Sequence, residues 1–196
     1  MNNDMTGFNS LRFLGVAGRP RQPLVLKSVR WIPPISMRIK VNVDGATLGA
    51  SGPLGCGGIF RTHRGFVKGY FYHYIGIGMA YEAELWAIIY SIKHVIHHKW
   101  HDLWIESDSE NVVTTLKERS RNVPWRILLD WVACMNNLDL LNLLASHIYR
   151  ESNQVADTFS KKVILEGSTR WTFGAPEYCN SLVNDDMCGV VHSRIC

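Results

Sequence analysis

Four short motifs, each containing one carboxylate, hold the residues of this chain that are best suited to chemistry. They are Val43-Asp44-Gly45-Ala46, Ala83-Glu84-Leu85-Trp86-Ala87, Glu106-Ser107-Asp108-Ser109 and Asn153-Gln154-Val155-Ala156-Asp157. Carboxylates brought into one site repel one another, and divalent cations, which prefer hard oxygen ligands, relieve that repulsion. Two such ions about 4 Å apart can activate water and stabilise the leaving oxygen of a phosphodiester. The motifs therefore predict a metal centre, provided that the fold gathers the four acids.

Each acid also has an ordinary structural explanation. Asp44 with the glycine after it is a common turn pair, and Glu84 can be a solvated helix residue. Asp108 and Asp157 can each stabilise the start of a helix. The combination is more informative than any single acid, because two strand ends, a helix margin and a helix start each supply one of them.

Hydrophobic periodicity predicts the elements that must position these acids. Apolar and polar residues alternate over 38–44, which predicts a strand with one buried face and with Asp44 at its end. A glycine-rich segment at 45–58 is typical of a loop, and two further strands are expected at 57–62 and 66–74. The short connection between these two strands indicates a hairpin.

The second half of the chain alternates helices and strands. The expected elements are a helix at 79–98, a strand at 103–108, a helix after Ser109, a helix after Pro124, a strand at 141–149 and a last helix that Ser152 or Asn153 caps and that runs to about Glu166. This order predicts an α/β fold with a five-stranded mixed sheet, in which three antiparallel meander strands precede crossover units and helices flank the sheet. The carboxyl ends of parallel strands lie at one edge of the sheet, so acids from four elements can meet in one site there.

Composition limits the class of protein. The chain has 196 residues, of which 46% are hydrophobic and 19% charged, so it can form one packed domain with length left for tails. Its formal net charge of +4 is compatible with an anionic partner. No apolar run approaches the roughly 20 residues that cross a bilayer, so we expect no membrane partner. The five cysteines form no Cys-x-x-Cys pair, which favours reduced thiols in an intracellular protein of the nucleus, the cytoplasm or an organelle.

Two boundaries divide the chain into three parts. Trp31-Ile32-Pro33-Pro34 ends a basic N-terminal extension at 1–30, which is either a plain linker or a transit peptide. The domain itself is expected at 31–166. Residues 167–196 have no clear periodicity and predict an irregular C-terminal extension.

Residues 31–166 resemble a type 1 ribonuclease H domain, in the plant form that is similar to the ribonuclease H segment of non-LTR retrotransposons. The motifs that carry the resemblance are Trp31-Ile-Pro-Pro34, Ile39-Lys-Val-Asn-Val-Asp-Gly-Ala46, Gly57-Gly-Ile-Phe-Arg-Thr-His-Arg-Gly65, Ala83-Glu-Leu-Trp-Ala87, Glu106-Ser-Asp-Ser109 and Arg150-Glu-Ser-Asn-Gln-Val-Ala-Asp157. The resemblance implies that a monomer hydrolyses the RNA strand of RNA–DNA hybrids. It also implies two Mg²⁺ ions, or Mn²⁺, held by Asp44, Glu84, Asp108 and Asp157.

The resemblance also assigns roles to further residues. His147 lies ten positions before Asp157, where relatives have a general acid or proton shuttle, but it can equally be a structural histidine of the last predicted strand. Asn153 is expected to cap the last helix, and Asn42 could touch nucleic acid. Glu106 is implied to be a neighbour of the site and not a ligand. Candidate phosphate contacts are Arg61, Arg64, Lys68, Arg119, Arg121 and Arg150.

Two other functions are compatible with the same residues. The chain can be a nucleic-acid-binding module without turnover that derives from a retroelement. It can also be a related metal nuclease, such as an exonuclease or a nucleotidyl transferase, with another substrate. Cleavage of a hybrid in the presence of a divalent metal distinguishes the first function from the other two.

Overall fold

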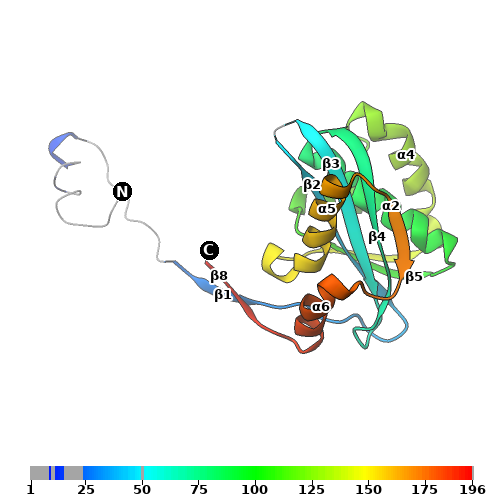
Figure 1. The fold of residues 1–196 in the computed structure, drawn as a ribbon. Helices are drawn as coiled ribbons and strands as arrows, with labels where there is room; N and C mark the ends of the chain where they lie inside the picture. Colours follow the sequence, from blue (N-terminus) through cyan, green and yellow to red (C-terminus); the bar gives the residue numbers. More distant parts are fainter. Residues whose placement is uncertain (1–8, 10–11, 16–23, 50, 196) are drawn as a thin grey trace. The chain divides into compact units, whose positions relative to one another are not determined.

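A computed structural model describes residues 9, 12–15, 24–49 and 51–195 of the chain. It divides into two compact units, one made of residues 1–28 and 193–196 and the other of residues 29–192. The basic extension predicted at 1–30, with its transit-peptide alternative, lies largely outside the described residues. β1 (Leu26–Val29) and β8 (His192–Ile195) form a two-stranded sheet (Figure 1), and all their residues except Val29 and His192 belong to the smaller unit. Within the described ranges, no helix is long and apolar enough to cross a membrane.

The larger unit is built on a mixed sheet that has six strands among the described residues, in the order β6-β5-β2-β3-β4-β7. The meander strands are antiparallel, β5 and β6 run parallel to β2, and β7 pairs antiparallel with the outer edge of β4. The strands are β2 (Ile39–Thr47), β3 (Gly52–Arg61), β4 (Val67–Gly78), β5 (Asp102–Ser107), β6 (Asn142–His147) and β7 (Arg170–Phe173). The predicted α/β fold with a mixed sheet is confirmed, but this sheet has one strand more than the five predicted, which is β7.

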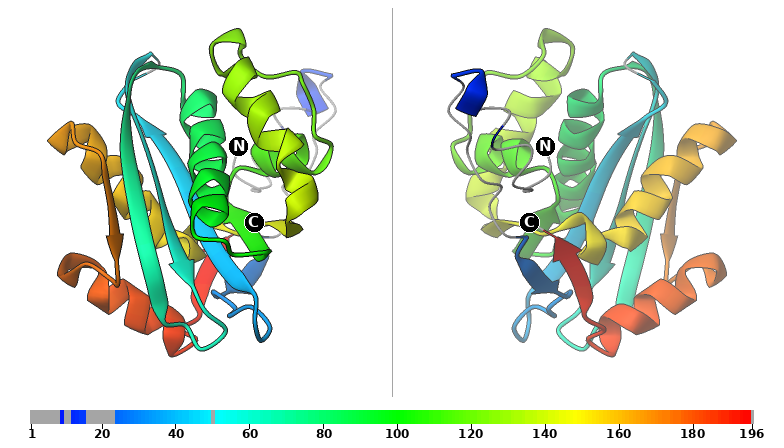
Figure 2. Two further views of the ribbon diagram at one scale, coloured as in Figure 1. Left: turned by 90° about the vertical axis from the view of Figure 1, so that its right-hand side faces the viewer. Right: turned by 90° about the vertical axis from the view of Figure 1, so that its left-hand side faces the viewer.

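Helices cover both faces of this sheet (Figure 2). On one face lie α2 (Ala80–His97), α3 (Glu110–Lys117) and α4 (Trp125–Asn136), and on the other lie α5 (Gln154–Glu166) and α6 (Asn180–Met187). Each face has its own apolar core, one around Phe60, Phe71 and Trp131 and the other around Tyr70 and Phe159. The sheet is therefore buried on both sides, which leaves its ends as the places for a site.

The glycine-rich segment is not the predicted loop. β2 continues to Thr47 and β3 begins at Gly52, so most of these glycines belong to strands. Their missing side chains allow helices to approach the sheet: a Cβ on Gly57 would lie 2.4 Å from the Cβ of Phe159 in α5. Packing against the helices, and not turn formation, therefore requires most of these glycines.

The prediction that β2 has one buried face is also wrong. Lys40 and Asn42, on the face expected to meet solvent, are almost completely buried. The Lys40 ammonium lies 2.8 Å from a carboxylate oxygen of Glu106, and the Asn42 amide donates to the other oxygen of that carboxylate at 3.2 Å. Buried charges persist only when they are paired in this way. Asn42 is therefore a structural residue and cannot touch nucleic acid.

Arg61 extends the same buried network to the C-terminal part of the chain. Its guanidinium donates to the side-chain oxygen of Asn42 at 2.7 Å and forms an ion pair with Asp186 of α6 at 2.5 Å. The indole of Trp31 donates to the same Asn42 oxygen at 2.8 Å and lies under the Arg61 guanidinium. Arg61 is 1% exposed, so the prediction that it contacts phosphate is wrong.

The prediction that residues 167–196 are irregular is wrong as well. The segment contains β7, α6 and β8, and the first two of these belong to the larger unit. Cys179 and Val183 are buried in the apolar core under α5. Short elements of this kind have little periodicity of their own, because they form against β4 and α5 and not by local preference.

The C-terminal segment should therefore contribute strongly to stability. We expect Asp186→Ala to lower the free energy of unfolding by about 3–5 kcal/mol, because it leaves the buried Arg61 guanidinium without the carboxylate of its ion pair. Urea unfolding measures the change, with Asp185→Ala at the exposed neighbouring position as the matched control. If Asp186→Ala lowers the free energy of unfolding no more than the control does, the ion pair between α6 and the sheet does not stabilise the protein.

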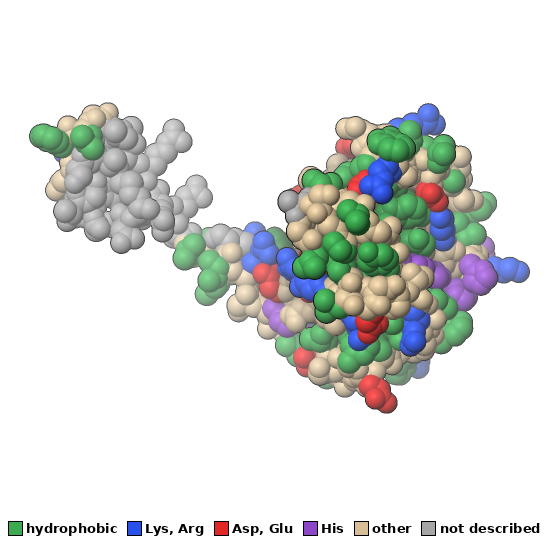
Figure 3. Space-filling model, turned by 45° about the horizontal axis from the view of Figure 1, so that its top comes forward, with side chains coloured by type: hydrophobic (Ala, Val, Ile, Leu, Met, Phe, Trp, Pro, Cys, Tyr) green, Lys and Arg blue, Asp and Glu red, His purple; other side chains and the backbone are tan. Residues whose placement is uncertain are grey.

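Histidines gather on one side of the domain (Figure 3). At the end of α2, His94 and His98 stack on the ring of Trp171 in β7, with centroids 4.2 and 4.8 Å apart. Burial, with smaller contributions from neighbouring histidines, lowers the pKa of His94 to about 4. His94 is therefore neutral at neutral pH, and its ring holds β7 against the helix by aromatic packing.

Candidate metal centre

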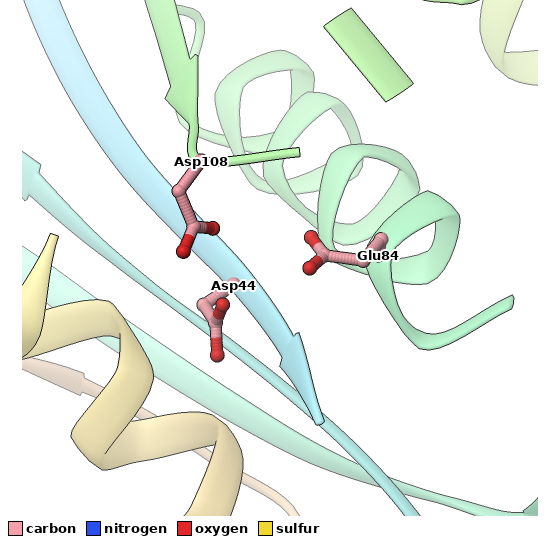
Figure 4. Close-up of side chains that lie close together, drawn as sticks. All are labelled: Asp44, Glu84 and Asp108. Atoms are coloured by element: carbon pink, nitrogen blue, oxygen red, sulfur yellow. The ribbon is translucent and has the colours of Figure 1, made fainter. Parts of the chain in front are cut away.

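Three of the four predicted acids meet at one end of the sheet (Figure 4). Asp44 comes from β2, Glu84 from the first turns of α2, and Asp108 from the residue after β5. Each offers a carboxylate oxygen that lies within 4.8 Å of an oxygen of the other two, and the three side chains point toward one another. Among the acids, histidines and cysteines of the described residues, these three carboxylates form the group that could hold a metal ion.

The backbone explains why two aspartates from distant parts of the chain are neighbours. β2 and β5 are parallel, and Val43 pairs with Ser107 at the end of the ladder. The next residue along each chain segment is the acid, so Asp44 and Asp108 lie side by side where the parallel ladder ends. The prediction that Asp44 ends its strand is wrong, because β2 continues to Thr47 in its pairing with β3.

A glycine brings the third acid to this pair. Gly45 follows Asp44, and a Cβ at this position would lie 2.2 Å from the backbone nitrogen of Glu84. α2 therefore rests directly on the backbone of β2, which places the Glu84 side chain against Asp44. Ser107 supports Glu84 through a long hydrogen bond of 3.5 Å from its hydroxyl.

The electrostatics of the three acids favour a cation. Burial, followed by the charge of Asp108, raises the pKa of Asp44 to about 8. Burial and the charge of Asp44 also raise the pKa of Glu84 well above its ordinary value. Without a cation, the protein can keep these carboxylates together only by holding protons on them. Oxygen donors alone, close together and partly buried, fit a divalent cation, and Asp44, Glu84 and Asp108 would hold it.

Asp157 lies at the same pocket but outside the tight group. It is in the first turn of α5 and lines an open pocket of about 530 Å³ together with the three acids. Arg150 contacts one of its carboxylate oxygens at 2.8 Å, and Lys161 contacts the other at 2.6 Å. The structure thus brings the predicted fourth acid near the centre with both oxygens engaged by cations.

His147 is not among the residues that line this pocket. It is the last residue of β6, pairs in register with Ser107, and is exposed, with its ring 5.3 Å from that of Tyr149. Its backbone belongs to the strand, as the structural alternative expected. Its role as a general acid stays a prediction.

Asn153 has a different role from the one expected. It is the residue before α5, but its side chain makes no capping hydrogen bond within the described chain. Its amide instead donates to the carbonyl of Val43 at 2.9 Å and reaches Asp108 at 3.5 Å. Asn153 thus ties the start of α5 to β2 beside Asp44 and to Asp108 after β5. No sequence signal distinguishes this contact from a helix cap, because both use a buried asparagine at the same position.

The fold and the site together define a class of protein. The class has an antiparallel meander followed by parallel crossover strands, with one acid in the first of these strands, one just after a parallel strand and one on a helix. This is the ribonuclease H fold.

Comparison with known proteins identifies the family. A family model described as reverse transcriptase-like matches residues 42–163, which is more than half of the chain. The chain belongs to this family, and its larger unit is a ribonuclease H domain. An Arabidopsis thaliana protein named as a ribonuclease H protein is 31% identical to this chain over 175 residues, which are 88% of the chain. The chain spans only 28% of the length of that relative.

Solved structures have the same fold. Ribonuclease H1 from Halobacterium salinarum superposes with a TM-score of 0.58 at 22% identity, covering 67% of this chain and 99% of that one. LC11 ribonuclease H1 gives a TM-score of 0.60, also at 22% identity, and covers 66% of this chain and 99% of its own. A foamy viral protease–reverse transcriptase matches 76% of this chain with 22% of its length, at 15% identity and a TM-score of 0.59. At these identities the likeness shows the fold alone.

Proposed function

We propose that this domain is a metal-dependent endonuclease that hydrolyses the RNA strand of RNA–DNA hybrids. The observation that carries the proposal is the group of Asp44, Glu84 and Asp108, whose oxygens lie within 4.8 Å of one another at the carboxyl edge of the sheet. Bound divalent ions, Mg²⁺ or Mn²⁺ in this proposal, would supply charge neutralisation and an activated water for phosphodiester hydrolysis. The three acids would fix the position of that charge, and Asp157 would complete the set for a second ion.

The remaining residues at the pocket have roles that follow from their charge and position. Arg150 and Lys161 place positive charge beside the acids, which suits the phosphate backbone of a nucleic acid. In this proposal, substrate phosphate pairs with the Arg150 and Lys161 side chains in place of Asp157, and the Asp157 carboxylate is then free to bind a metal ion. His147, at the same edge of the sheet, would move a proton to the leaving group.

The choice of an RNA–DNA hybrid as the substrate rests on the relatives. LC11 ribonuclease H1 and the foamy viral protease–reverse transcriptase were both solved in complex with an RNA/DNA hybrid. The 2′-hydroxyls of an RNA strand let a protein distinguish it from DNA with little reading of bases. A retroelement origin, to which the name of the family points, belongs to the same proposal. So does an intracellular location, which agrees with free thiols at the described cysteines Cys56, Cys134, Cys179 and Cys188.

The proposal is tested with end-labelled hybrid, duplex DNA, duplex RNA and single strands, each incubated with Mg²⁺, Mn²⁺ or EDTA. We expect cleavage of the RNA strand of the hybrid in either metal and none in EDTA. Asp108→Asn should lower the rate at least about 100-fold, because loss of a ligand costs more than loss of an outer partner. Asp102→Asn, at the opposite end of β5, is the matched control and should keep its activity.

Two results would contradict the proposal. If the wild type cleaves no hybrid with either metal but binds it in EDTA, the domain is a binding module without turnover. If it prefers duplex DNA or single strands, it is a related metal nuclease with another substrate.

A further inference from the structure

One buried hydroxyl contacts the carboxylate at the centre of the acid group. Ser160 in α5 is completely buried, and its Oγ donates a hydrogen bond to Oδ2 of Asp44. The same Oγ lies 2.9 Å from the backbone carbonyl oxygen of Asp157, one turn earlier in the helix. Ser160 therefore reaches Asp44 from α5, whereas Glu84 reaches it from α2 and Asp108 from the end of β5.

The sheet is shaped to bring this hydroxyl to Asp44. In the β2–β3 ladder, Asp44 pairs with Gly57. A Cβ on Gly57 would lie 3.1 Å from the backbone nitrogen of Ser160, and a Cβ on Gly55 would lie 2.5 Å from its carbonyl oxygen. α5 therefore rests on two glycines of β3, and this close approach puts the Ser160 side chain directly over the neighbouring aspartate.

A buried serine in a helix has a simpler alternative, which is to donate to a carbonyl of the preceding turn. Ser91 in α2 does so: it is completely buried, and its hydroxyl donates to the carbonyl of Ala87 at 2.7 Å. Ser160 has both acceptors within reach but has one proton to donate. When a bound cation keeps Asp44 ionised, its carboxylate is the stronger acceptor, because hydrogen bonds to charged groups are about twice as strong as those between neutral groups.

We propose that Ser160 is a positioning residue for the metal centre. Its hydroxyl holds one oxygen of Asp44, which leaves the other oxygen to face Glu84 and Asp108 and to bind a divalent cation. The inference rests on the proposed function, because it assumes that the acid group holds an ion. It adds a residue from the opposite face of the sheet to that site, and it explains why β3 has glycine at both positions under α5.

The test is ion binding to the whole chain, without substrate. Isothermal titration calorimetry with Mg²⁺ and with Mn²⁺ compares the wild type, Ser160→Ala and Ser91→Ala. The two variants delete the same hydroxyl from equally buried helical sites, so their effects on packing are matched. We expect Ser160→Ala to weaken ion binding about tenfold, as is typical when an outer partner of a metal ligand is removed. Ser91→Ala should bind ions like the wild type, and thermal unfolding in EDTA should show similar, small losses for both variants.

Each outcome bears on the inference. Weaker ion binding in Ser160→Ala alone supports it. Equal affinity in Ser160→Ala and the wild type overturns it, and equal weakening in both variants overturns it by showing a general effect of packing. A wild type that binds neither ion overturns both the inference and the metal dependence of the proposed function. Ion binding that depends on Ser160, in a protein that cleaves no hybrid, supports the inference and overturns only the proposed activity.

Discussion

Replacement of Asp44 by asparagine should abolish metal-dependent cleavage and, at the same time, make the metal-free protein more stable at pH 8. Asp44 is the acid common to the interactions at the centre, since it lies against Glu84, Asp108 and Ser160. Its loss removes a ligand, so we expect at least about a 100-fold lower rate on a hybrid substrate and no measurable ion binding. It also removes a buried charge that the metal-free protein holds at a cost.

The stability effect has a defined direction with pH. In the unfolded chain Asp44 loses its proton near its ordinary pKa of 3.8, whereas in the folded protein burial and Asp108 raise that pKa to about 8. Between these values the folded state binds more protons, so stability is complete below about pH 4 and falls as the pH rises toward 8. The asparagine variant lacks this slope.

Urea unfolding in EDTA at pH 5, 6.5 and 8 measures the effect. At pH 8 we expect Asp44→Asn to exceed the wild type by about 2 kcal/mol, with a smaller difference at pH 5. Asp139→Asn is the control, because Asp139 is exposed and pairs with Arg119 at the surface. If Asp44→Asn is less stable than the wild type at pH 8, the three acids do not repel one another in the metal-free protein.

The second large effect is expected from Gly45→Ala. The added Cβ would lie 2.2 Å from the nitrogen of Glu84 and 2.3 Å from the carbonyl carbon of Ala83, and both are backbone atoms that no rotamer change can move. α2 would have to leave the surface of β2, taking Glu84 away from Asp44. We expect a loss of more than about 5 kcal/mol of unfolding free energy, or failure to fold, which is exceptional for a single methyl group.

Gly167→Ala provides the control for this prediction. Gly167 ends α5 with a φ of +61°, and a Cβ there would meet none of the described atoms within 4 Å. Its cost should be that of a left-handed conformation alone, about 1–2 kcal/mol. Circular dichroism and urea unfolding of both variants measure the difference. A Gly45→Ala protein that is as stable as Gly167→Ala would mean that α2 does not rest on β2 at this point.

Much of the fold follows from local patterns in the sequence. The alternation before Asp44 predicts β2, the apolar stripe from Tyr81 to Ile96 predicts α2, and Pro124 predicts the start of α4. Turn and helix signals between them determine the order of the elements, and the rule for parallel strands then predicts a common edge for Asp44 and Asp108. These features depend on residues that are neighbours in the chain, which is why periodicity detects them.

The errors have one physical cause, which is contact between residues far apart in the chain. The glycines at 45–58 are typical of a loop by local preference, but their purpose is to let α2 and α5 approach the sheet. Lys40 and Asn42 look like a solvent face because their partners Glu106 and Arg61 lie on other strands. Residues 167–196 look irregular because β7 and α6 form against β4 and α5.

For the site, the sequence by itself determined which residue types are available and the elements on which they lie. The tertiary structure alone decided their relations: it gathers Asp44, Glu84 and Asp108, pairs Asp157 with Arg150 and Lys161, and turns Ser160 toward Asp44. The reason is that a carboxylate's environment depends on burial and on charges a few ångströms away in space. In this protein those charges and hydrogen-bond donors come from distant parts of the chain, and Ser160 is 116 positions away from Asp44.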